Sequence, residues 1–188
     1  MCELGIERLY DCTVRGKQIR LIIRQSPAVL EIRDYIESIK SMLRKLQIVG
    51  NGLVLEFVLP ALATRLRQAI ALFDEVTMLG IGISLSHFPC NESGFKALAH
   101  LKADIVRPRP SCLHGEADSI QETAHKMHSQ NVEIILPYSE TVEEYSPKWR
   151  EHADYIQDDG PRLELLQGEL RGGTPLGRRD RANPFWIV

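Results

Sequence analysis

The sequence lacks several features that would place it in a membrane or on a nucleic acid. No apolar run in its 188 residues approaches the ~20 residues that a helix needs to span a bilayer. Its first ten residues, MCELGIERLY, lack the basic and apolar regions of a signal peptide. The formal net charge of −2 provides no global attraction to anionic partners. We therefore expect a cytoplasmic protein with no membrane span and no nucleic-acid partner.

Paired cysteine motifs are lacking as well. The four cysteines occur singly, with no CxxC pair, at Cys2, Cys12, Cys90 and Cys112. Two of them have a histidine close in sequence, in HFPC (87–90) and CLH (112–114), but neither spacing matches a common structural zinc site. We expect free thiols in a reducing compartment, and no metal or other cofactor.

What the sequence does contain is a regular alternation of short apolar runs and amphipathic stretches. The runs predict strands at 18–24, 53–59, 81–86, 103–107, 132–137 and 154–157. The stretches between and after them predict helices within 29–47, from Leu62 to near Gly80, and at 92–101, 116–130, 140–152 and 160–170. In the first helix the apolar stripe is formed by Ile32, Ile36, Ile39, Leu43 and Leu46, and Gly50 is the predicted stop.

Six strand–helix units of this kind indicate parallel strands joined by right-handed crossovers. A complete eightfold barrel takes about 250 residues, so the fold class is α/β, a partial or modified (β/α) barrel with outer helices. Residues 18–170 form the predicted domain, preceded by an N-terminal segment (1–17) and followed by a tail rich in Gly, Pro and Arg (171–188). The tail is either flexible or a docking segment that buries its apolar end, PFWIV.

Polar residues close most of the predicted strands, and their order and spacing resemble the EAL domain, the cyclic di-GMP phosphodiesterase barrel, from about Arg20 to Gln157. The matches keep some family residues and replace others. In RQS, Arg24 stands in place of the asparagine of the family motif N-x-S. In EFVL, Glu56 keeps the first glutamate of E-x-T-E. SHFPCN corresponds to D-D-F-G-T-G and keeps only its phenylalanine: its first four residues are Ser86, His87, Phe88 and Pro89.

The remaining motifs are similarly altered. In RPR, which corresponds to K-I-D, Arg107 replaces the lysine and Arg109 the aspartate. In PYSET, which corresponds to E-G-V-E-T, Pro137 replaces the first glutamate, and Glu140 and Thr141 are kept. DYIQ keeps Gln157. The E-A-L tripeptide and the two strands expected before RLIIR are not recognisable. The sequence therefore resembles an N-terminally truncated, degenerate EAL domain, and most resembles the FimX-like EAL domains. The uncovered sheet edge then needs the N-terminal segment, the PFWIV tail or a second copy in a homodimer.

The resemblance implies a two-cation mechanism that these residues do not support. At the matched positions only Glu56 and Glu140 remain as carboxylates, and a pair of divalent cations needs several. A guanidinium such as that of Arg109, about 5 Å from a divalent cation at an effective dielectric near 20, costs about 6–7 kcal/mol. Ser86 and His87 are adjacent on a strand, where neighbours point to opposite faces, so they form no nucleophile–base pair. We expect no enzymatic activity.

Three functions therefore stand open, in this order. The first is a catalytically inactive scaffold in cyclic di-GMP signalling, which by resemblance is linked to PilZ-type or other signalling proteins and to type IV pili. The second is a metal-independent cyclic di-GMP receptor, and the third, least favoured, is an active phosphodiesterase. A receptor would use arginines to grip phosphate and Phe88, Phe95 or Tyr138 to stack on guanine. Its predicted site comprises Arg24, Glu56, Ser86, Phe88, Arg107, Arg109, Glu140 and Gln157.

Overall fold

The strands form one seven-stranded sheet in which every pairing is parallel. The computed structural model describes residues 2–16, 19–114, 117–137, 147–156 and 185–187. The strand order is β6-β5-β4-β3-β2-β1-β7. The strands are β1 (Arg20–Arg24), β2 (Leu53–Val58), β3 (Gly82–Phe88), β4 (Ile105–Pro108), β5 (Glu133–Leu136), β6 (Tyr155–Ile156) and β7 (Phe185–Ile187). The six predicted strands are confirmed as β1 to β6.

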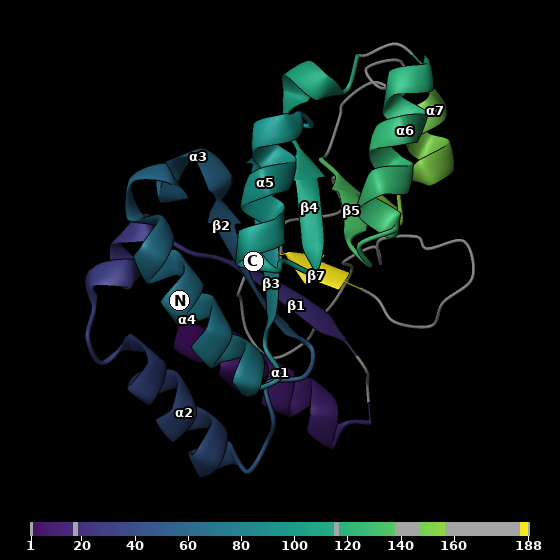
Figure 1. Ribbon diagram of the computed structural model, residues 1–188. Helices are drawn as coiled ribbons and strands as arrows, with labels where there is room; N and C mark the ends of the chain where they lie inside the picture. Colours follow the sequence, from purple (N-terminus) through teal and green to yellow (C-terminus); the bar gives the residue numbers. More distant parts are fainter. Residues whose placement is uncertain (1, 17–18, 115–116, 138–146, 157–184, 188) are drawn as a thin grey trace.

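Helices follow the strands and pack along one side of the sheet (Figure 1). They are α1 (Cys2–Val14), α2 (Tyr35–Leu46), α3 (Leu59–Leu62), α4 (Leu66–Met78), α5 (Glu92–Leu101), α6 (Ala117–His128) and α7 (Pro147–His152). Short 3-10 turns occur at η1 (Pro27–Glu31), η2 (Ala63–Arg65) and η3 (Pro110–Cys112). The molecule is a partial (β/α) barrel, as expected. Within the described ranges, no helix combines the length and apolar character needed to cross a bilayer.

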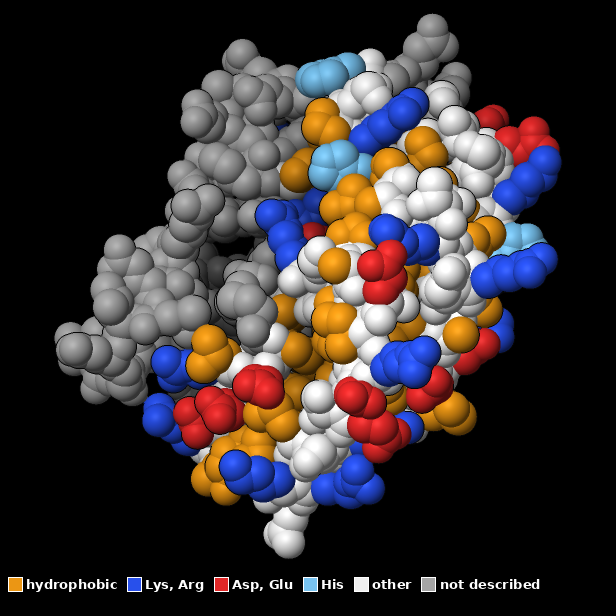
Figure 2. Space-filling model, turned by 90° about the vertical axis from the view of Figure 1, so that its left-hand side faces the viewer, with side chains coloured by type: hydrophobic (Ala, Val, Ile, Leu, Met, Phe, Trp, Pro, Cys, Tyr) orange, Lys and Arg blue, Asp and Glu red, His pale blue; other side chains and the backbone are white. Residues whose placement is uncertain are grey.

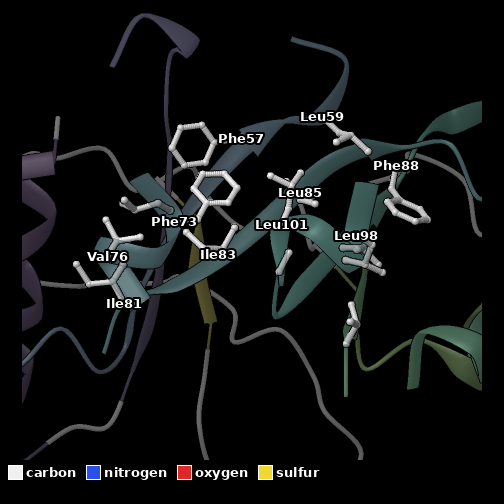
Figure 3. Packing of buried hydrophobic residues seen from close by; sticks show 14 of the residues in the cluster. Phe57, Leu59, Phe73, Val76, Ile81, Ile83, Leu85, Phe88, Leu98 and Leu101 are labelled. Atoms are coloured by element: carbon white, nitrogen blue, oxygen red, sulfur yellow. The ribbon is translucent and has the colours of Figure 1, made fainter. Parts of the chain in front are cut away.

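The alternation of side chains along each strand separates two apolar clusters. The larger cluster lies between the sheet and the helices; its aromatic centre is Phe57, whose ring centroid is 4.9 Å from that of Phe73 on α4. Figure 3 shows these two rings side by side, with Ile83 and Leu85 of the next strand beside them. The smaller cluster lies on the opposite, concave face and consists of Ile22, Val54, Ile105, Ile135 and Tyr155.

Polar layers lie above and below this concave cluster, because side chains two residues apart share a face of the sheet. Below it, at the amino ends of the strands, Arg20 of β1 forms an ion pair with Glu133 of β5. Those two strands are separated by three others in the sheet order, so the ion pair shows how strongly the sheet is curled. Above the cluster, at the carboxyl ends, lie Arg24, Glu56 and Arg107.

The helix after β1 begins later and ends earlier than predicted. Pro27 opens the 3-10 turn η1, Ile32 is extended (φ −86°, ψ 108°), and the α-helix starts only at Tyr35. Ile32 is consequently 54% exposed rather than part of the buried stripe. Gln47, at φ 54°, ends the helix in the left-handed conformation, three residues before the predicted Gly50. Leu62 likewise belongs to the separate short helix α3 rather than to α4.

The outer edge of β1 is covered by the C-terminal end of the same chain. Strand β7 pairs parallel to β1 in the register Arg20↔Phe185, Leu21↔Trp186 and Ile22↔Ile187, and Figure 1 shows it beside β1. Of the three ways to cover this edge, the structure therefore shows the PFWIV tail. Helix α1 lies over β1 instead, where a side chain on Gly5 would clash with Ile23. The predicted helix at 160–170 and the arginines of the tail lie outside the described residues.

Candidate functional site

A carboxylate held between two guanidinium groups lies at the carboxyl ends of β1, β2 and β4, which together with the end of β3 we call the mouth. Glu56 is 2% exposed. Its Oε1 accepts a hydrogen bond of 2.9 Å from Nε of Arg24, and its Oε2 lies 3.1 Å from Nη2 of Arg107. The parallel register sets Arg24 directly opposite Glu56. The three predicted site residues are thus brought together on the concave face.

The two arginines differ sharply in their exposure. The side chain of Arg107 is 6% exposed, whereas that of Arg24 is 61% exposed. Burying an ion is costly unless an opposite charge compensates it, so Glu56 and Arg107 depend on each other inside the barrel. Arg24 instead places a solvated cation above them. Within the described part of the chain, its hydrogen bond to Glu56 is made by Nε.

Two serines of β3 line the floor of the mouth, and both are buried. The hydroxyl of Ser84 lies 3.5 Å from Oε2 of Glu56, and that of Ser86 donates to the carbonyl oxygen of Phe57 at 3.4 Å. His87 is exposed and has a left-handed backbone (φ 57°). The sheet register shifts between Leu85 and Phe88, so the regular alternation that the prediction assumed is interrupted at His87. Both serine hydroxyls make contacts within the fold.

The aromatic residues predicted to stack on a base are placed less favourably. Phe88 is fully buried and Phe95 is 8% exposed, and their rings meet edge to face at 5.4 Å. Both belong to the core beneath the helices, so neither presents a free ring face to the mouth. Tyr138, Glu140 and Gln157 lie outside the described residues.

Arg109 adds a second exposed cation at the end of β4. Its backbone N–H donates to the carbonyl oxygen of Phe88 at 3.0 Å, which ties the turn after β4 to the end of β3. Among the described residues no carboxylate lies within ion-pair distance of its side chain. Arg24 and Arg109 thus make the described rim of the mouth cationic, whereas the one described carboxylate of the mouth is buried and paired with two arginines.

The described residues of the mouth do not by themselves fit a pair of divalent cations. Such cations need several oxygen ligands, and nowhere in the described ranges do three or more His, Cys, Asp or Glu side chains cluster. Both oxygens of Glu56 already face guanidinium nitrogens.

Two contacts of the concave face were not predicted from the sequence. One is Ser84 against Glu56, which follows from the register that sets Glu56 opposite Ser84. The other is the ion pair between Arg20 and Glu133, 113 residues apart. Strand alternation alone places Ser84 and Glu56 on one face. The contact between β1 and β5 depends on the curl of the whole sheet, which no local pattern encodes.

Comparisons with known proteins agree with this geometry. The sequence matches the EAL domain family over residues 1–157, and no curated protein matches it. Among solved structures, the FimX EAL domain of Xanthomonas citri in complex with c-di-GMP is similar, with a TM-score of 0.76 at 18% identity over 84% of this chain and 65% of that one.

Two further structures give the same picture. Another FimX EAL domain has a TM-score of 0.73 at 22% identity over 83% of this chain and 65% of that one. The FimX EAL domain of Pseudomonas aeruginosa bound to c-di-GMP has a TM-score of 0.70 at 21% identity, over 83% and 64%. The chain thus spans just under two thirds of the length of these domains. The match over residues 1–157 establishes that this chain belongs to the EAL domain family.

Proposed function

We propose that this chain is a catalytically inactive EAL domain that binds cyclic di-GMP at its mouth without a metal ion. The observation that carries the proposal is the carboxylate of Glu56 between the guanidinium groups of Arg24 and Arg107, at 2.9 and 3.1 Å. Hydrolysis by the family mechanism needs metal-bound water. The arrangement that excludes the cations also presents positive charge to the phosphates.

Loss of catalysis follows from the charges around Glu56. A divalent cation about 5 Å from one guanidinium, at an effective dielectric near 20, is repelled by about 6–7 kcal/mol. Two guanidinium groups contact Glu56, and Ser86, His87 and Arg109 stand where the family has aspartates. The single carboxylate of Glu56 offsets only one of these two positive charges. A water molecule here therefore has no metal ion to lower its pKa.

Binding of cyclic di-GMP is favoured by the exposed arginines of the mouth. Guanidinium groups hydrogen-bond phosphate oxygens in pairs. The side chain of Arg24 is 61% exposed, and Arg109 at the end of β4 is exposed as well. Two of the similar FimX structures contain c-di-GMP. We assign Arg24 and Arg109 to the phosphates and Arg107 to the support of Glu56. Phe88 has no part in this assignment, because its ring is buried.

The alternative is a scaffold that docks a PilZ-type or other signalling protein and does not bind the dinucleotide. It rests on the resemblance to FimX-like domains, as does the link to type IV pili. The described face shown in Figure 2 carries interspersed acidic and basic side chains rather than one large patch of a single sign. The exposed positive charge at the mouth therefore favours the receptor over the scaffold.

Titration calorimetry with cyclic di-GMP separates these two functions. We expect micromolar or tighter binding by the intact chain. Arg24→Gln should weaken it about 10- to 100-fold, because a hydrogen bond to a charged group contributes about 1.5–3 kcal/mol. The matched control is Arg67→Gln, an exposed arginine on α4, which should bind like the parent. A folded parent chain that releases no heat would contradict the receptor, and recovery of a PilZ-type protein by it would support the scaffold.

A further inference from the structure

Two cysteine thiols meet beside the mouth, although they are 22 positions apart in the sequence. Cys90 follows β3, and Cys112 ends the turn η3 after β4. Their Sγ atoms lie 3.8 Å and 3.9 Å from the same carbonyl oxygen, that of Phe88. The two thiols therefore converge on one backbone acceptor. Both side chains are only partly buried, so that small oxidants can reach them.

Separate backbone contacts fix the position of each of the two cysteines. The carbonyl oxygen of Phe88 also accepts the backbone N–H of Arg109 at 3.0 Å, which fixes η3 against the end of β3. The indole Nε1 of Trp149, a residue 1% exposed on α7, donates to the carbonyl oxygen of Cys112 at 3.0 Å. Cys90 has a left-handed backbone (φ 44°), a conformation that non-glycine residues keep only where their surroundings impose it. The approach of the two sulfurs is therefore built into the packing.

We propose that Cys90 and Cys112 are a redox modification site, at which a peroxide converts the two thiols into an intramolecular disulfide. The Cys112 thiolate attacks hydrogen peroxide, giving a sulfenic acid and releasing hydroxide. The Cys90 sulfur then attacks the Cys112 sulfur, and the sulfenic oxygen leaves as water. Overall, two thiols and one peroxide give one disulfide and two waters. A dithiol reductant reverses the reaction.

The order of these steps follows from the surroundings of the thiols. Burial raises the pKa of Cys90, and the neighbouring Cys112 raises it further. A thiol that holds its proton is a poor nucleophile toward peroxide, so the first oxidation falls to Cys112. The resulting bond joins the segment directly after β3, the strand that carries His87, to the turn that follows Arg109. It would therefore fix two exposed residues of the mouth relative to each other.

Peptide mapping of the full-length chain tests this site. After treatment with hydrogen peroxide and blocking of free thiols, we expect a linked peptide pair containing Cys90 and Cys112, and blocking at only two of the four thiols. The melting temperature should rise by about 5–10 °C, because the bond closes a loop of this length in the unfolded chain. Dithiothreitol should reverse both changes.

Serine variants provide the matched controls. Cys90→Ser and Cys112→Ser should each abolish the linked peptide, whereas Cys2→Ser and Cys12→Ser, both on α1, should leave it unchanged. The map of the parent chain tests the proposal even if a variant fails to fold. Oxidation of Cys112 to sulfinate without a linked peptide, or disulfides that join two chains, would overturn it.

Discussion

Replacing Glu56 with glutamine should lower the free energy of unfolding by about 3–5 kcal/mol, because the exchange leaves a buried charge without its partner. Arg107 is 6% exposed and lies 3.1 Å from Oε2 of Glu56. The amide of glutamine keeps the shape of the side chain, removes its charge and replaces one accepting oxygen with a donating NH2 group. Urea denaturation followed by circular dichroism measures the loss. It would take a large part of the about 5–15 kcal/mol that stabilise a typical domain.

Two companion variants separate charge burial from mere contact. Arg24→Gln removes the other arginine on Glu56, but the side chain of Arg24 is 61% exposed, so we expect a loss of only about 0–1 kcal/mol. The double variant Glu56→Leu with Arg107→Met should recover much of the stability, because an apolar pair replaces the ion pair as a whole. A loss below about 1 kcal/mol for Glu56→Gln would show that this carboxylate is not the counter-charge of Arg107.

Removal of residues 184–188 should increase the self-association of the chain. Strand β7 covers the edge of β1 through the register of Phe185, Trp186 and Ile187. Without it, the backbone groups of that edge become free to pair with another chain. The lost backbone pairing should also cost about 1–4 kcal/mol, at about 0.5–1.5 kcal/mol for each hydrogen bond. Light scattering coupled to gel filtration measures the association, and urea denaturation measures the stability.

A synthetic peptide of residues 183–188 is the control for this deletion. Added in excess, it should occupy the edge of β1 and return the shortened chain to the monomer. A peptide of the same composition in scrambled order should not. If the shortened chain remains monomeric and equally stable at high concentration, the edge of β1 does not depend on β7.

Strands β1 to β6 could be predicted from the sequence because each is short, apolar and flanked by turn residues, whereas the pairing of β7 with β1 was one of three alternatives for that edge. That was enough to place Arg24, Glu56 and Arg107 at strand ends, and the parallel register then brings them together. The boundaries of α2 were predicted less well. The sequence pattern does not show that Pro27 opens a 3-10 turn or that Gln47 adopts the left-handed conformation ending the helix.

The contacts that were not predicted join residues far apart along the chain. The approach of Cys90 to Cys112 depends on the turn after β4 folding back onto the carbonyl oxygen of Phe88. The burial of Phe88 and Phe95 in the core also depends on the packing of α5 against the sheet, which withdraws two aromatic rings from the predicted site. In both cases the tertiary packing, and not the local sequence, determines which residues the side chain contacts.

The most direct test of a metal-free receptor is one titration of the intact chain with cyclic di-GMP, carried out once with EDTA and once with Mn²⁺, with chromatography of the nucleotide afterwards. The arrangement of Arg24, Glu56 and Arg107 predicts the same affinity in both conditions and an intact dinucleotide. Binding that requires Mn²⁺, or the appearance of the linear hydrolysis product, would contradict it.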